Sequence, residues 1–190
     1  MAKFPQPRVD PVERLGFFKL AQTLDEKGFI GAILVTDTYT KPLEFRVTFP
    51  VKPTPVQRTL YGASLIPHIG IELCGKPLYE VLENPPDILF IQQDDFLPLS
   101  ERVRCLVVRV RPLESLSSLL EQDVQEVKLP SLVQRYEAIA AAFPTQYEPD
   151  TVQTATTVLR ELSKQVDLLE PFERIEKALR ALAEEDQRFR

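Results

Sequence analysis

Blocks of apolar and alternating residues in the first fifty positions predict three neighbouring strands. The segment from Phe29 to Thr36 is apolar on both faces, which is typical of a central strand covered on both sides of its sheet. After a polar turn, apolar residues occupy every second position between Leu43 and Phe49, which predicts a strand with one buried face. Residues 17–23 precede a tight polar turn and are interpreted as the first strand. The pattern therefore predicts a three-stranded antiparallel meander over residues 17–49.

Helical signals follow the meander. Thr54, Pro55 and Gln57 have the spacing of a capping box with proline at the first helical position, which predicts a helix from Pro55 to about residue 65. Pro67 is expected to break or kink this helix, because proline lacks the N–H group that a helix interior uses. A second helical piece is expected over residues 77–83.

Two further strands, at residues 88–91 and at about 102–110, complete a predicted core domain of residues 15–112. The predicted fold class is α+β: a largely antiparallel sheet (meander) covered by the helices of residues 55–83, followed by a helical C-terminal segment. Twelve apolar residues are expected in the core: Ile30, Ile33, Leu34, Val35, Phe45, Val47, Leu60, Leu78, Leu89, Phe90, Val107 and Val108.

The C-terminal segment, residues 131–188, is predicted to be helical throughout. A capped helix is expected over residues 131–143, after a polar connector. From Val152 to Leu182 apolar residues then recur at spacings of three and four, with one interruption at Pro171. This stripe predicts a helical hairpin or one kinked long helix. The spacing alone does not decide whether these helices pack on the core or project from it.

Composition and charge narrow the class of protein. A chain of 190 residues with 44% hydrophobic and 27% charged residues is typical of a globular protein. Two cysteines are too few for a disulfide framework, so Cys74 and Cys105 are interpreted as buried thiols, and a cytoplasmic location is expected. The charge is uneven: residues 1–112 hold 14 Lys and Arg against 13 Asp and Glu, and residues 113–190 hold 9 against 15. The acidic tail argues against indiscriminate nucleic-acid binding and leaves a local basic patch open.

The motifs of common enzymes are absent. The chain has six glycines, and none of them forms a phosphate-binding loop, a dinucleotide fingerprint or a nucleophile elbow. His68 and Cys74 could in principle form a thiol–base pair, but their spacing matches no protease or metal-site signature. No catalytic residue, metal or cofactor is therefore assigned, and a non-enzymatic role is favoured.

The leading functional hypothesis from the sequence is a protein–protein interaction or assembly subunit of a larger intracellular complex. The partner would be another protein or a second copy of the chain, bound through the C-terminal helices, with no role for a membrane. The partner-binding residues would be the apolar stripe, namely Leu159, Leu162, Val166, Leu169, Phe172, Ile175, Leu179 and Leu182.

The alternative hypothesis is a nucleic-acid-associated protein or a divalent-metal nuclease. Four arginines on or beside the last predicted strand would bind phosphates: Arg102, Arg104, Arg109 and Arg111. Carboxylates at strand ends would bind the metal, with Asp37, Asp87 or Asp95 as the main candidates and Glu44 and Asp94 nearby. Each of these two assignments has a local structural alternative. Charged residues on an edge strand prevent aggregation, and aspartate at a strand end commonly closes a turn.

Overall fold

The computed structural model describes residues 6–9, 11–113, 125–129 and 138–189, and it contains one mixed sheet of seven strands. The strands are β1 (Arg14–Gln22), β2 (Phe29–Asp37), β3 (Pro42–Val47), β4 (Ile88–Ile91), β5 (Leu106–Pro112), β6 (Gln125–Leu129) and β7 (Ile139–Phe143). Their order across the sheet is β3-β2-β1-β4-β5-β7-β6. Four of the six neighbouring pairs are antiparallel, so the predicted α+β class with a largely antiparallel sheet is confirmed.

The three central strands run parallel to one another. β1 pairs in parallel with β4, and β4 pairs in parallel with β5, through registers such as Phe17 opposite Phe90. The carboxyl ends of β1, β4 and β5 therefore meet at one edge of the sheet. The sequence did not indicate this arrangement, because β1 and β4 are separated by the whole meander and the helices that follow it.

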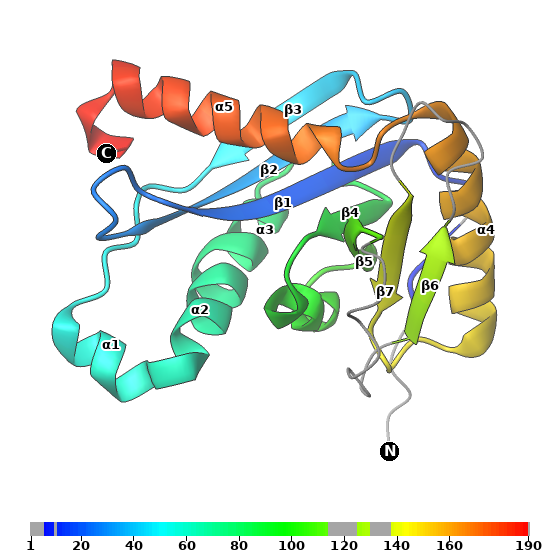
Figure 1. Cartoon of the computed structure of the whole chain (residues 1–190), viewed down its shortest axis with the longest axis horizontal. Helices are drawn as coiled ribbons and strands as arrows, with labels where there is room; N and C mark the ends of the chain where they lie inside the picture. Colours follow the sequence, from blue (N-terminus) through cyan, green and yellow to red (C-terminus); the bar gives the residue numbers. More distant parts are fainter. Residues whose placement is uncertain (1–5, 10, 114–124, 130–137, 190) are drawn as a thin grey trace.

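Helices cover both faces of the sheet (Figure 1). One face is covered by α2 (Leu65–His68) and α3 (Lys76–Glu80), with α1 (Pro55–Tyr61) at the far end of the same helical run, and the other face is covered by α4 (Pro149–Gln165) and α5 (Glu170–Glu185). Alternate strand residues enter the two layers: Phe17 and Phe90 face α4 and α5, whereas Phe18 and Leu89 face the α2–α3 side. This alternation is the period of two that a strand imposes on its side chains.

The C-terminal apolar stripe faces the sheet. Six of its members, Leu159, Leu162, Val166, Phe172, Ile175 and Leu179, are buried in the core layer beneath α4 and α5, and Leu169 and Leu182 are packed against that layer. The chain therefore forms two helices that lie on its own sheet, joined near Pro171 (Figure 1). Helices of this length gain most of their stability from such packing.

The helix predicted over residues 131–143 is wrong where the structure describes it. Residues 139–143 form β7, a fully buried strand between β5 and β6, and residues 130–137 lie outside the described part of the chain. Three consecutive alanines in this segment favour a helix by intrinsic propensity, but pairing on both sides outweighs it. Because β7 pairs with β5, the sheet continues past the expected domain boundary at residue 112.

Pro67 does not end the helical run. It lies in the first turn of α2, where the backbone N–H groups have no partner within the helix. A π-helical turn, Ile69–Gly75, then leads directly into α3. Gly70 is required in this turn, because a β-carbon there would lie 2.2 Å from the Phe96 ring.

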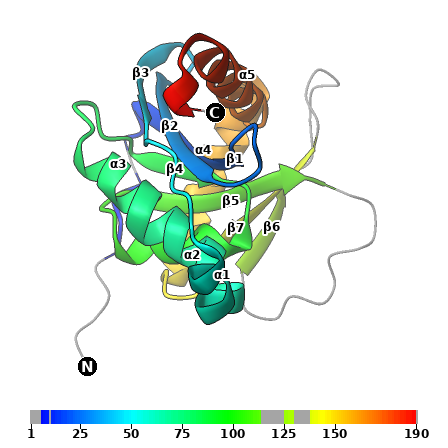
Figure 2. The same ribbon diagram turned by 90° about the vertical axis from the view of Figure 1, so that its left-hand side faces the viewer.

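Two of the twelve expected core residues lie at the surface. Phe45 is 39% exposed because β3 is an edge strand, and Leu60 is 78% exposed because α1 buries none of its residues. Figure 1 shows α1 at the far end of the helical run, away from the strands, and Figure 2 shows the run from α3 through α2 to α1 in front of the sheet. Among the described helices, none has the length and apolar character needed to cross a membrane.

Candidate functional site

The four arginines predicted to bind phosphate do not lie together. Arg109 has no exposed surface, and it pairs with Asp94 at 2.8 Å and with Glu126 at 3.1 Å. Arg111 pairs with the same Glu126 carboxylate at 2.9 Å. These two arginines connect β5 to β6 and to the segment after β4. Their charges are therefore paired with carboxylates of the fold.

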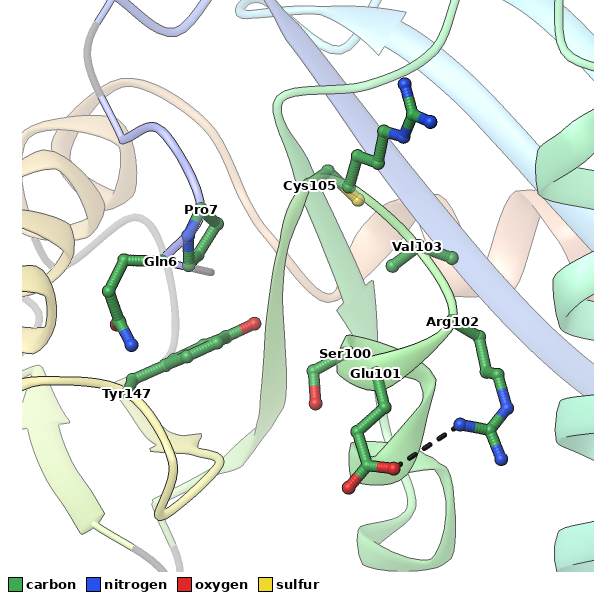
Figure 3. Close-up of a pocket in the computed structure, with 9 residues that line it drawn as sticks. Gln6, Pro7, Ser100, Glu101, Arg102, Val103, Cys105 and Tyr147 are labelled. Carbon is green, nitrogen blue, oxygen red and sulfur yellow. Dashed lines mark hydrogen bonds and ion pairs between the residues drawn. The ribbon is translucent and has the colours of Figure 1, made fainter. Parts of the chain in front are cut away.

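Arg102 and Arg104 line a surface hollow of about 560 Å³, called here the arginine hollow. Its other lining residues are Gln6, Pro7, Ser100, Glu101, Val103, Cys105 and Tyr147. Figure 3 shows Gln6 and Tyr147 on one side of it and Ser100, Glu101 and Arg102 on the other. A hollow of this volume has the size of a small-molecule or nucleotide site.

The two arginines of the hollow differ in their availability. Arg102 pairs with Glu72 at 2.9 Å and with Glu101 at 3.3 Å, and these carboxylates raise the pKa of its guanidinium. Arg104 is exposed, and within the described residues its side chain forms no ion pair. Arg104 is therefore the cation in this hollow that a ligand can approach at the lowest cost.

Hydrogen bonds fix the floor of the hollow. The Tyr147 hydroxyl accepts the backbone N–H of Val107 at 2.9 Å, which joins the segment before α4 to β5. The Gln146 side chain donates to the Ser100 hydroxyl at 2.7 Å. Burial raises the pKa of the Cys105 thiol to about 12 and also raises the pKa of Tyr147. Both groups are neutral at pH 7, so neither supplies a nucleophile there.

The histidine and the other cysteine do not form a catalytic pair. The His68 ring lies against the Tyr61 ring, with 4.9 Å between centroids. The Cys74 sulfur is buried 3.8 Å from the Thr48 hydroxyl, and burial raises the pKa of the thiol. The alternative of thiol catalysis thus has no geometry to support it.

The strand-end carboxylates proposed as metal ligands are dispersed and occupied. Asp87 accepts the backbone N–H groups of Glu13 and Arg14, both at 2.9 Å, and Asp37 accepts those of Tyr39 and Lys41 in the turn before β3. Asp94 binds Arg109, and Asp95 is exposed. Across the described ranges, no three Asp, Glu, His or Cys side chains gather where they could hold a metal ion. The carboxylates named from the sequence therefore do not fit a divalent metal centre.

Glu44, the remaining carboxylate candidate, is a structural clamp. It pairs with Arg46 at 2.6 Å and accepts the backbone N–H groups of Glu83 and Asn84, so it ties the edge strand β3 to the loop after α3. Burial alone would raise the pKa of Glu44, but these hydrogen bonds outweigh it and lower the pKa to about 2.

We expect Glu44→Gln to lower the free energy of unfolding by about 1–3 kcal/mol at pH 7, because two backbone N–H groups and the Arg46 guanidinium lose a charged acceptor. The Glu44 carboxyl is charged at neutral pH in both the folded and the unfolded state. As pH falls, the unfolded chain is protonated first, because its carboxyl has the higher pKa. The stabilisation should therefore be lost as pH falls from 4.5 toward about 2. Urea unfolding at pH 7 and pH 3 measures the difference. Glu161→Gln on exposed α4 is the control, and a wild-type advantage equal at both pH values would contradict the clamp.

A second pocket, of about 370 Å³, lies beyond the carboxyl end of β4, where Gln92 comes beside Lys19 of β1. We call it the strand-end pocket; its lining residues are Lys19, Gln92, Pro112, Asp167, Leu169, Glu170, Phe172, Glu173 and Glu176. Open sheets of this kind commonly bind ligands beyond the carboxyl ends of parallel strands. Sequence reasoning missed this site, because Lys19 and Gln92 meet only through the parallel pairing of β1 with β4.

The comparisons with known proteins bear on the fold. No family model and no curated protein matches the chain. Among solved structures, endonuclease V from Bacillus subtilis aligns with a TM-score of 0.59 and 12% identity over 95% of this chain and 86% of that one. Endonuclease V from Streptomyces avermitilis aligns with a TM-score of 0.56 and 13% identity, over 95% and 84%. Ciona intestinalis endonuclease V, in complex with a 24mer DNA that contains an inosine followed by a ribo-adenosine, aligns with a TM-score of 0.51 and 11% identity, over 93% and 92%.

These likenesses correct the leading functional hypothesis. The expectation of a non-enzymatic assembly subunit is wrong, because nearly the whole chain has the fold of a group of nucleases, and the comparisons favour the nucleic-acid alternative. The apolar stripe that motivated the assembly hypothesis lies in the core. What the comparisons establish is that the chain has an endonuclease V-like fold.

Proposed function

We propose that this chain acts on nucleic acid, and that Arg104, with Arg102 beside it, contacts a phosphate at the arginine hollow. The observation that carries the proposal is the endonuclease V-like fold over 95% of the chain. Two of the structural neighbours contain DNA in complex with the protein. The accessible charge of Arg104 supports the choice of this hollow over the buried pair Arg109 and Arg111.

The volume and the cationic lining of the hollow support a phosphate contact. A guanidinium binds phosphate oxygens through paired N–H groups, and phosphate contacts supply most of the affinity for nucleic acid. The Gln6 amide and the Ser100 hydroxyl lie on opposite sides of the hollow, as Figure 3 shows, and both are already hydrogen-bonded within the fold. Glu101 and Glu72 hold Arg102 in place, so Arg104 is the residue whose loss should weaken binding most.

We expect Arg104→Glu to weaken nucleic-acid binding roughly tenfold and to reduce its salt dependence, because one phosphate contact is lost and a repulsive charge is gained. Fluorescence anisotropy with labelled single- and double-stranded DNA and RNA, at two salt concentrations, measures both effects. Arg160→Glu is the matched control, because Arg160 is exposed on α4 in the acidic part of the chain.

Two outcomes would contradict the proposal at different levels. If the wild-type protein binds none of the oligonucleotides at low salt, the nucleic-acid function fails. If Arg160→Glu weakens binding as much as Arg104→Glu, the function stands and the arginine hollow is the wrong surface.

Strand cleavage is a second candidate activity, favoured by the nuclease fold of the neighbours. The described residues offer no carboxylate cluster for a metal, so no cleavage step is derived from them. Incubation with Mg²⁺ or Mn²⁺ and DNA containing an inosine followed by a ribo-adenosine, the DNA bound in the Ciona structures, tests for cleavage directly.

A further inference from the structure

Lys19 lies in the strand-end pocket, where the parallel strands β1 and β4 place their side chains next to each other. Phe17 on β1 is opposite Phe90 on β4, so the register places Lys19 beside Gln92, two positions further along each strand. The Lys19 ammonium donates a hydrogen bond to the Gln92 side-chain oxygen at 3.3 Å. It also forms an ion pair with Glu176 of α5.

The ion pair gives the ammonium a fixed position. The Lys19 side chain is 19% exposed, and the hydrogen bond from its ammonium lowers the pKa of the Glu176 carboxyl. Arg180 adds a weaker favourable charge to the same carboxyl. The positive charge of Lys19 thus lies between a carboxylate oxygen and an amide oxygen, which are the ligand types that hard divalent cations prefer.

The other carboxylates of the pocket have partners of their own. Asp167 accepts the backbone N–H groups of Leu169 and Glu170 at the start of α5. Glu170 pairs with Arg174 at 2.9 Å, and Glu173 pairs with Lys177 at 3.6 Å. Glu176 is therefore the carboxylate whose charge Lys19 compensates.

From this arrangement we infer that Lys19 acts as a built-in cation, which occupies the position between Glu176 and Gln92 and closes the strand-end pocket to divalent metal ions. A metal ion there would face the ammonium charge at close range, and the repulsion would offset its attraction to Glu176. This inference is independent of nucleic-acid binding, because it concerns the charge balance of the protein alone.

The test replaces the built-in cation with an oxygen ligand. In Lys19→Asp the pocket would offer two carboxylates and the Gln92 oxygen, which is a donor set suited to Mn²⁺. We expect this variant to bind one Mn²⁺ at least about tenfold more tightly than the wild-type protein. The free Mn²⁺ signal in electron paramagnetic resonance measures binding, and melting temperature with and without Mn²⁺ confirms that the folded protein is the species that binds.

Matched variants make the result specific. Lys164→Asp makes the same charge change beside a carboxylate, Glu161, on the exposed face of α4, and it should gain no Mn²⁺ site. Adding Glu176→Gln to Lys19→Asp should abolish the gain. Lys19→Asn removes the positive charge without adding a carboxylate, and it replaces Lys19→Asp in the test if that variant does not fold. Its gain in Mn²⁺ affinity should be smaller. The inference is overturned if wild-type protein binds Mn²⁺ as tightly as the Lys19 variants, or if neither Lys19 variant gains a site.

Discussion

Replacing Phe172 with alanine should lower the free energy of unfolding by about 3–5 kcal/mol, which is the usual cost of emptying a large buried site. Phe172 lies in the first turn of α5 and is 1% exposed. Its ring meets the edge of Phe17 at a centroid distance of 5.5 Å, and Phe17 stacks on Phe90 at 5.2 Å. The substitution therefore removes the contact that fixes α5 on the two central strands.

Denaturant unfolding followed by circular dichroism measures this effect. Glu173→Ala is the control: its side chain lies in the same turn and is 69% exposed, and the change should stay within about 0.5 kcal/mol. Phe172→Leu should recover part of the loss, because it restores volume without the aromatic contact. A Phe172→Ala protein as stable as the wild type would mean that α5 does not pack on the sheet in solution.

Replacing Arg109 with alanine should cost on the order of 3 kcal/mol, because the change empties a fully buried site and leaves the carboxylates of Asp94 and Glu126 without their partner. Arg109 has no exposed surface and pairs with Asp94 and Glu126, whose side chains are 42% and 19% exposed. Thermal and urea unfolding measure the loss. Arg111→Ala should cost less than about 1 kcal/mol, since Arg111 is 31% exposed and shares Glu126.

A triple variant separates the effect of charge from the effect of volume. Arg109→Met combined with Asp94→Asn and Glu126→Gln removes all three charges and keeps most of the buried volume. Such replacements are often neutral, so this variant should be more stable than Arg109→Ala. If the triple variant is no more stable than Arg109→Ala, carboxylates left without a partner are not the source of the loss.

The parts of the fold that could be predicted are those that a short stretch of sequence determines. Within the meander, β2 follows from an apolar run, β3 from alternation and β1 from the polar turn that comes after it, and β4 follows from four consecutive apolar residues. β7 could not be predicted in this way, because its alanines carry a helical preference and only the neighbouring strands reverse it. Phe45 and Leu60 were placed in the core because apolar character does not reveal that β3 is an edge strand or that α1 packs on nothing buried.

The candidate sites show the same contrast between residues that are close in sequence, which could be predicted, and contacts between distant segments, which could not. Arg102 and Arg104 could be named from their spacing on one face before β5. Arg109 has the same chemistry in the sequence, and its burial depends on Asp94 and Glu126 from other segments. The pairing of Lys19 with Glu176 joins residues at opposite ends of the chain, so no local pattern indicates it.

The contact between these distant segments also affects how the chain folds during synthesis. Lys19 of β1 and Glu176 of α5 are 157 residues apart, and contacts between such distant segments must overcome a large loop-closure entropy before they form, which slows folding. On the ribosome, β1 and β2 emerge early with one apolar face uncovered, and α5 reaches them only after α4 and α5 have been synthesised. During that interval the face that α5 later covers is available to other unfinished chains. A nascent chain stalled before residue 170 should therefore depend on chaperones, whereas one released after residue 189 can bury that face by itself.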